Sequence, residues 1–306
     1  MMRKVLMLTA MSMMTFFVNT AAAAERSDTS TNAVEVSQKA LTGVDFVADF
    51  YQPQGSEQQP AVLVLGGSEG GKPTRLAKRI AALGYPVLAV AYFKADGLPA
   101  ELEKVPLDYF DAVKSWLQQQ HPANAEGINV VGWSKGAELA LLLASRDDAY
   151  QRVVAISPSA VVWAGILKDW TQTPSSSWQD DGEVLAFVPF KPTGQVAGLR
   201  DLYEQSLAQQ EAVAEARINV EQSAGALLLI TGGEDEVWPA KRMADMICQR
   251  MQQHQRGDDC LQQHYPNAGH ILDPAYPLGG TEQSNADAAT DADRHIARFL
   301  AADVPS

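Results

Sequence analysis

Ser134 is the side chain in this sequence with the clearest chemical potential. It lies between Gly132 and Gly136 in a G-x-S-x-G pattern. The apolar, β-rich run 128–131 precedes the pattern, and a run of strong helix formers, 137–144, follows it. A strand, a glycine-flanked serine and a helix are typical of a nucleophile elbow, in which a side chain at either glycine would collide with neighbouring backbone. The pattern favours a nucleophilic serine over a plain Gly/Ser loop between buried elements.

Backbone N–H groups near this serine are expected to bind an oxyanion. Lys135 stands at the start of the predicted helix, where the helix dipole places partial positive charge. The glycine-rich loop 66–71 follows an apolar strand pattern and can bring a second amide close to a substrate oxygen. Ser68 and Glu69 are the candidate donors in this loop, and the sequence does not choose between them. The loop lacks the spacing of a P-loop or a dinucleotide-binding fingerprint, which argues against nucleotide binding.

His270 is the expected base. A serine hydroxyl needs a base to accept its proton, and in hydrolases with this element order the histidine follows the last strand. The chain has five histidines. Only His270 stands in a turn directly after a predicted last strand, 260–265. The preceding Gly269 is expected to leave room for the imidazole ring.

A carboxylate that follows the strand predicted at 226–230 would orient this base. Three acids, Glu234, Asp235 and Glu236, occur there. Asp235 is favoured because it stands at the tip of the turn in a G-x-x-D arrangement, and Glu234 comes next. A solvated acidic loop would explain any one of the three equally well.

The order of the elements predicts an α/β fold with a mostly parallel sheet flanked by helices. Predicted strands and helices alternate over residues 44–156 and again over 226–300. The polar segment 27–38 has no apolar period and is expected to be irregular.

The alternation lapses over residues 160–223. So long an interval without regular strands favours a lid over a plain insertion. Its aromatic residues Trp163, Trp178 and Phe190 are candidate walls of a pocket for an acyl group, although they would also suit plain packing beneath the segment.

The N-terminal residues 1–24 are predicted to be a cleaved signal peptide. Arg3 and Lys4 give a basic start, an apolar run follows, and 22–24 supply an A-x-A cleavage signature. The apolar run is shorter than the ~20 residues that a transmembrane helix needs, which favours cleavage over an uncleaved anchor. We therefore expect an exported protein, periplasmic or secreted, with a single α/β domain over residues 25–306.

Composition narrows the possible partners. The net charge of −13 argues against binding to nucleic acid or to anionic membranes. Cys248 and Cys260 are the only two cysteines. In an exported protein they would form one disulfide, while two buried free thiols remain an equal alternative. Neither their spacing nor the rest of the chain implies a metal or a cofactor.

Five separate stretches resemble the C-terminal catalytic domain of acyl-CoA thioesterases and bile acid-CoA:amino acid N-acyltransferases. They are residues 132–140, 174–178, 187–190 with 201–204, 232–239 and 265–277. The resemblance covers roughly residues 61–300. It implies an α/β-hydrolase fold with a Ser134–Asp235–His270 triad that acts on small-molecule acyl thioesters or esters.

Two features of the sequence depart from that family. Animal members usually carry an N-terminal β-sandwich domain, for which few residues precede 61 here. Members that transfer acyl groups to amino acids typically have cysteine where this chain has Ser134, which favours hydrolysis. The alternatives are acyl transfer to an acceptor other than water, and a non-catalytic binding protein on a hydrolase scaffold. The oligomeric state is not predicted.

Overall fold

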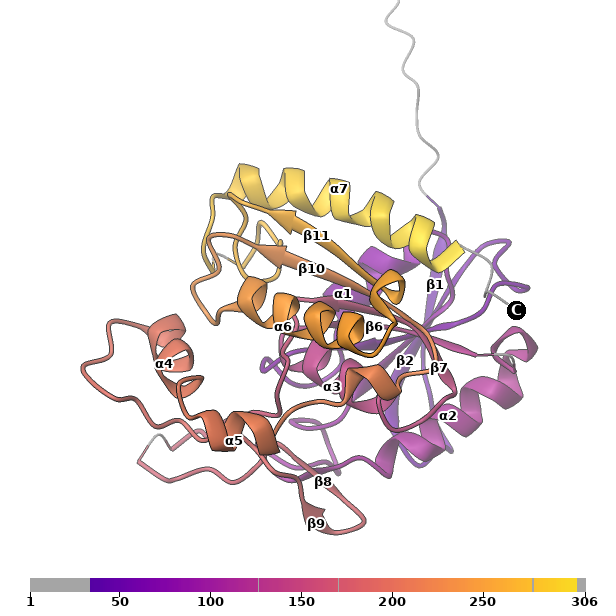
Figure 1. Cartoon of the computed structure of the whole chain (residues 1–306). Helices are drawn as coiled ribbons and strands as arrows, with labels where there is room; N and C mark the ends of the chain where they lie inside the picture. Colours follow the sequence, from indigo (N-terminus) through magenta and orange to yellow (C-terminus); the bar gives the residue numbers. More distant parts are fainter. Residues whose placement is uncertain (1–33, 126, 170, 277, 302–306) are drawn as a thin grey trace, which may run out of the picture. The chain divides into compact units, whose positions relative to one another are not determined.

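The central feature of the fold is an eight-stranded sheet with the strand order β1-β2-β4-β3-β6-β7-β10-β11. The computed structural model describes residues 34–301 except 126, 170 and 277. The strands β1 and β2 pair antiparallel with each other, and β2 is antiparallel to β4. Every other pairing in this sheet is parallel (Figure 1). The strands are β1 Val36–Ala40, β2 Val47–Pro53, β3 Val62–Leu65, β4 Val87–Ala91, β6 Ile128–Trp133, β7 Tyr150–Ile156, β10 Ala226–Gly232 and β11 Cys260–Tyr265.

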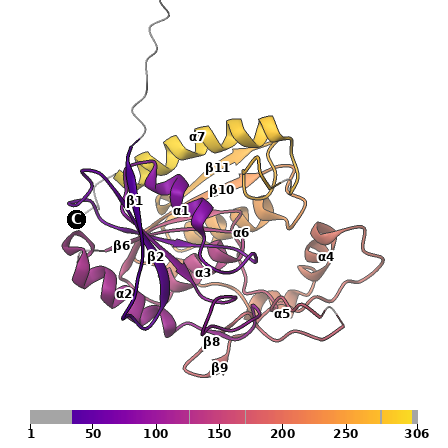
Figure 2. The same cartoon turned by 180° about the vertical axis from the view of Figure 1, so that it is seen from behind.

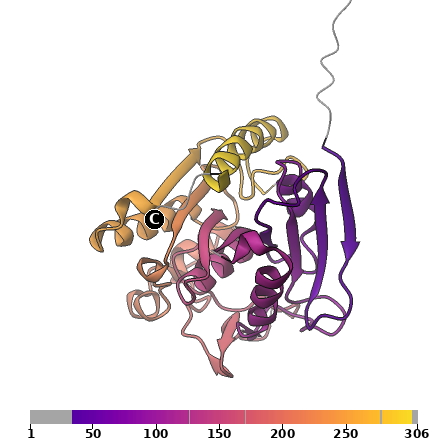
Figure 3. The same cartoon turned by 90° about the vertical axis from the view of Figure 1, so that its right-hand side faces the viewer.

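Helices cover both faces of this sheet, as the edge-on view in Figure 3 shows. Alternate residues of β3 face opposite sides, since Leu63 and Leu65 join one hydrophobic cluster and Val62 and Val64 the other. In the main domain layers the first cluster is filled mainly from α2, α3 and α6, with Tyr203 and Val220 added from the segment after β7, and the second cluster is filled from α1 and α7. Figure 2 shows the same elements from behind. The helices are α1 Thr74–Ala81, α2 Tyr109–Gln120, α3 Lys135–Ala144, α6 Ala240–Gln253 and α7 Glu282–Ala301, with short 3₁₀ turns η1 Pro122–Asn124 and η3 Gly257–Asp259.

The interval after β7 forms a structured excursion of its own. It contains β8 Trp178–Asp180, β9 Glu183–Val184, α4 Leu199–Ser206, α5 Gln210–Glu215 and the 3₁₀ turn η2 Val220–Gln222. The strands β8 and β9 make a small sheet with β5 Val105–Pro106, in the order β5-β8-β9. In Figure 1 this excursion lies below and to the left of the main sheet. We call residues 157–225 the insertion.

The predicted α/β fold with a mostly parallel sheet is confirmed, whereas one predicted boundary is wrong. The segment 27–38 was expected to be irregular, yet β1 begins at Val36. This strand lies at the sheet edge with mostly exposed side chains, so it has no apolar pattern to reveal it. The structure also joins Cys248 to Cys260 in a disulfide, with the two Cα atoms 5.4 Å apart. Of the two possibilities for these cysteines, the disulfide is the one present.

Two further observations concern the predicted export segment and membrane spans. The signal peptide predicted over residues 1–24 lies outside the described residues. Among the residues that the structure describes, none of the helices combines the length and the apolar character that crossing a bilayer requires.

Candidate active site

Ser134 stands at the junction of β6 and α3 with a backbone conformation that side chains rarely adopt, φ 54° and ψ −123°. The flanking glycines make this turn possible. A Cβ added at Gly132 would lie 2.2 Å from the carbonyl oxygen of Gly136, and one at Gly136 would lie 2.2 Å from that of Gly66. The predicted collisions at both glycines are therefore confirmed, and the local geometry is that of a nucleophile elbow.

Three side chains meet at the carboxyl edge of the parallel strands. His270 Nε2 lies 2.8 Å from Ser134 Oγ, and His270 Nδ1 lies 2.8 Å from Asp235 Oδ2. Ser134 follows β6, Asp235 follows β10 and His270 follows β11. The carboxyl ends of parallel strands lie at one edge of a sheet, so residues far apart in sequence become neighbours there. All three are buried, with relative exposures of 8%, 1% and 2% in that order.

Hydrogen bonds fix the carboxylate of Asp235 in its orientation. Its Oδ1 accepts the backbone N–H groups of Val237 and Trp238 at 2.8 and 3.0 Å, which leaves Oδ2 for the imidazole. Glu234 and Glu236 are both exposed. The structure thus brings Asp235, rather than either neighbouring acid, to His270.

The turn that carries His270 is held by hydrogen bonds to both polar groups of the His270 backbone. The hydroxyl of Ser157 donates to the His270 carbonyl, and the His270 N–H donates to the carbonyl of Leu278 at 2.9 Å. Gly269 was expected to leave room for the imidazole. The contact that requires a glycine is a different one, because a Cβ at Gly269 would lie 2.0 Å from the carbonyl oxygen of Gly279.

Of the candidate oxyanion donors, Lys135 and Ser68 line the same cavity as Ser134, whereas Glu69 is not part of its lining. The amide of Lys135 is among the first N–H groups of α3, which have no partner within a helix. A Cβ at Gly67, next to Ser68, would lie 3.0 Å from the Ser134 Cβ, so this loop closely approaches the serine. The carboxylate of Glu69 instead accepts the indole N–H of Trp133 at 2.7 Å.

The cavity at Ser134 has a volume of about 510 Å³. Its apolar wall comes mainly from the insertion, and Val237 and Trp238 complete the wall beside Asp235. The insertion supplies Ile166, Leu167, Phe190, Leu199, Leu202 and Tyr203 to the lining. An apolar cavity of this size beside the Ser134 hydroxyl has the dimensions and lining of a small-molecule site.

The structure separates the three aromatic residues that were predicted to line a pocket. Phe190 is part of the cavity lining, and its contact with an acyl group stays a prediction. Trp163 and Trp178 are fully buried and lie outside the lining, so the prediction that they form its walls is wrong for both. Trp163 instead stacks behind Phe190, with ring centroids 6.2 Å apart.

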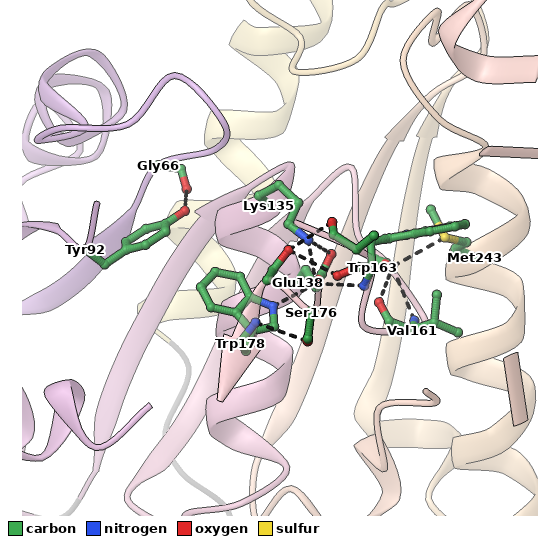
Figure 4. A network of polar contacts seen from close by, with 12 residues as sticks. Gly66, Tyr92, Lys135, Glu138, Val161, Trp163, Ser176, Trp178 and Met243 are labelled. Carbon is green, nitrogen blue, oxygen red and sulfur yellow. Dashed lines mark hydrogen bonds and ion pairs between the residues drawn. The ribbon is translucent and has the colours of Figure 1, made fainter. Parts of the chain in front are cut away.

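A buried ion pair directly beside the elbow was not foreseen. Lys135 Nζ lies 2.7 Å from both carboxylate oxygens of Glu138, and the two side chains are 1% and 0% exposed (Figure 4). Burial lowers the pKa of Lys135 and raises the pKa of Glu138, and the opposite charge of each partner counters both shifts. The signal was available in the sequence: two charged residues occur in an otherwise apolar helix, which is typical of a fully buried one.

Comparison with known proteins places the chain in a family. The family model described as BAAT / Acyl-CoA thioester hydrolase C terminal matches residues 105–289. This chain belongs to that family. One similar protein is acyl-coenzyme A thioesterase 6 of Mus musculus, which is 29% identical over 75% of this chain and 52% of its own length. Another is acyl-coenzyme A amino acid N-acyltransferase 2 of Rattus norvegicus, which is 30% identical over 74% of this chain and 52% of its own length.

The chain spans about half the length of these relatives. Solved structures agree with the family's fold. A dienelactone hydrolase-like promiscuous phosphotriesterase from metagenomic libraries superposes with a TM-score of 0.53 at 13% identity, covering 86% of this chain and 98% of that one. The Pyrococcus furiosus esterase Pf2001 superposes with a TM-score of 0.51 at 15% sequence identity, covering 87% of this chain and 93% of the esterase chain. At this identity the likeness concerns the α/β-hydrolase fold alone.

Proposed function

We propose that this chain is a serine hydrolase that cleaves acyl thioesters or carboxylic esters through Ser134, His270 and Asp235. The observation that carries the proposal is the continuous hydrogen-bonded line from Asp235 through His270 to Ser134, which ends in an apolar cavity. The line has the geometry by which a carboxylate orients an imidazole and the imidazole activates a hydroxyl. Membership of a family that contains thioesterases supports the same reaction class.

The proposed reaction has two halves. Ser134 Oγ attacks the acyl carbonyl carbon while His270 Nε2 takes the hydroxyl proton, and Asp235 stabilises the imidazolium that forms. The amides of Lys135 and Ser68 would bind the oxyanion of the tetrahedral intermediate. The intermediate expels a thiol or an alcohol, to which His270 returns the proton. Water then attacks the carbonyl carbon of the acyl-Ser134 ester while His270 takes a proton from the water. His270 returns this proton to Ser134 Oγ as the carboxylic acid leaves.

Acyl transfer to an acceptor other than water is the second candidate, because some similar proteins are named N-acyltransferases. The serine at position 134 favours hydrolysis, and product analysis with added amines or alcohols separates the two. Formation of an amide or a new ester in place of the free acid would establish transfer.

We also propose that the protein is exported, on the basis of the signal-peptide pattern in residues 1–24. Coenzyme A thioesters are cytoplasmic metabolites, so an exported enzyme would meet other acyl esters. Fractionation of cells that express the chain with and without residues 1–24 tests export. Equal cytoplasmic retention of both forms would contradict it.

A hydrolysis panel tests the proposed function. It compares acyl-CoA thioesters with p-nitrophenyl esters of matched acyl length, for the parent and for Ser134→Ala. We expect turnover of at least one of the two classes by the parent, and a loss of about 10⁴- to 10⁶-fold in the variant. Equal rates for parent and variant would refute the assignment of Ser134 as the nucleophile, and the ratio of the two substrate classes identifies the preferred leaving group.

A further inference from the structure

The ion pair between Lys135 and Glu138 lies in the interior immediately behind the elbow. Removing two charges from water is costly, and replacing a buried ion pair by apolar side chains is often neutral or stabilising. Stability alone therefore gives little reason for a lysine and a glutamate at these two positions. The side chain of Lys135 does, however, connect the first residue of α3 to the next turn of the helix, at 2.7 Å from both Glu138 oxygens.

Glu138 also receives hydrogen bonds from the insertion. Its Oε1 accepts the indole N–H of Trp178 at 2.7 Å and the backbone N–H of Trp163 at 3.2 Å (Figure 4). The Trp178 ring presents its face to the Lys135 ammonium, 5.4 Å from the ring centroid, which is within the range of a cation–π contact. One carboxylate thus joins the helix of Ser134 to the segment that forms the cavity wall.

Tyr92 extends this cluster to the glycine-rich loop. Its ring packs on Trp178 with centroids 5.6 Å apart. Its hydroxyl donates to the carbonyl of Gly66 at 2.5 Å, as Figure 4 shows. Burial raises the pKa of this tyrosine well above its ordinary value, so the hydroxyl keeps its proton for that bond. The bonded carbonyl belongs to the loop that carries Ser68, the candidate second oxyanion donor.

We propose that Glu138 is a positioning residue for the oxyanion site, an inference that rests on the proposed function. Its carboxylate anchors the Lys135 side chain and Trp178, and Trp178 in turn packs on Tyr92. One buried cluster thus connects Lys135, which carries one candidate donor amide, to the loop that carries the other. The cluster does not touch the reacting atoms. Its effect is geometric, because a preorganised donor stabilises the oxyanion only when it is held at the position that the oxygen will occupy.

Three conservative variants test this role: Glu138→Gln, Trp178→Phe and Tyr92→Phe. Each removes a charge or a single hydrogen-bond donor and keeps most of the side-chain volume. We expect kcat to fall about 10- to 100-fold while KM changes less than about threefold, because the lost interaction acts in the transition state. An alkylboronic acid, which forms a tetrahedral adduct with a nucleophilic serine, should show a Ki raised by the same factor as the loss in kcat/KM.

Tyr85→Phe is the matched control. The Tyr85 hydroxyl also donates to a backbone carbonyl, that of Ala297 at 3.2 Å, but Tyr85 packs in the hydrophobic cluster of α1 and α7, on the opposite face of the sheet from Tyr92. Its loss should leave kcat and the boronic acid Ki unchanged. Equal losses of activity in Tyr85→Phe and Tyr92→Phe would show that the fall in kcat reflects a general loss of stability. That result would overturn the positioning role.

The double variant Lys135→Met/Glu138→Leu separates positioning from stability. Because apolar replacement of a buried pair is often neutral or stabilising, it should unfold at a urea concentration near that of the parent. Its kcat should nevertheless remain as low as that of Glu138→Gln. If the double variant or the three conservative variants keep the parental kcat while Ser134→Ala is inactive, the positioning role is refuted and the proposed function stands. Activity retained in Ser134→Ala would instead refute the proposed function.

Discussion

Asp235→Asn is the substitution whose outcome follows most directly from the geometry. The carboxylate uses Oδ1 for two backbone N–H groups and Oδ2 for His270 Nδ1. An asparagine has one oxygen, and the two backbone donors will hold it at the Oδ1 position. Its NH₂ group then faces Nδ1, so the imidazole must carry its proton on Nε2. In that tautomer His270 cannot accept the proton of Ser134.

The expected loss in kcat is about 10⁴-fold, the size seen for the same change in a serine protease, or about 5.5 kcal/mol of activation free energy. The fold should persist, because both backbone hydrogen bonds at Oδ1 are kept. The assay is hydrolysis of a p-nitrophenyl ester, with circular dichroism to verify folding.

The neighbouring acids provide matched controls for this substitution. Glu234→Gln and Glu236→Gln change exposed side chains and should retain parental rates within about twofold. A folded Asp235→Asn protein with more than a tenth of the parental kcat would refute the tautomer argument. An equal loss in Glu234→Gln would show that the wrong acid has been assigned.

Three further predictions concern the cavity, the disulfide and a half-buried histidine. Phe190→Ala enlarges the cavity and should raise kcat/KM for an acyl chain two carbons longer by about tenfold relative to the parent's preferred chain, measured over a series of chain lengths. Cys248→Ser/Cys260→Ser opens a loop of sequence separation 12 and should lower the free energy of unfolding in urea by about 3 kcal/mol, with kcat unchanged. Burial lowers the pKa of His121, which packs on Phe50, below its ordinary 6.5. As pH falls, His121 is therefore protonated at a higher pH in the unfolded chain than in the folded protein. Neutral His121 contributes stability that is fully present above pH 6.5 and is lost as pH falls through the pKa of the folded state. In urea titrations at pH 7 and pH 5, His121→Phe should lose less stability than the parent, and equal losses would contradict the shift.

The elements that carry the candidate site were accessible from the sequence for a physical reason. Parallel strands buried on both faces give continuous apolar runs, and their carboxyl ends lie at one edge. Ser134 and Asp235 each follow such a run, in β6 and β10. His270 follows β11, a mostly polar edge strand, and was found because it stands in the turn after the last predicted strand. The structure brings these three side chains together, and their catalytic role remains a prediction.

Other features depend on tertiary contacts that no local pattern reports. Trp163 and Trp178 were assigned to a pocket wall because aromatic residues in an insertion suit either a wall or a core. Both side chains are buried in the core, where the Glu138 carboxylate accepts the indole N–H of Trp178 and the backbone N–H of Trp163. The edge strand at Val36 was missed for the opposite reason: its pairing is made by backbone groups, with little apolar burial.

Covalent labelling of the native protein by a fluorophosphonate, mapped by peptide mass spectrometry, tests the central claim most directly. We expect a single adduct on Ser134 in the parent and no adduct in Ser134→Ala. Labelling should be slower by at least about 10³-fold in His270→Ala, because the hydroxyl then has no base. Failure of the folded parent to label, or labelling of Ser134 at the parental rate without His270, would contradict the central claim.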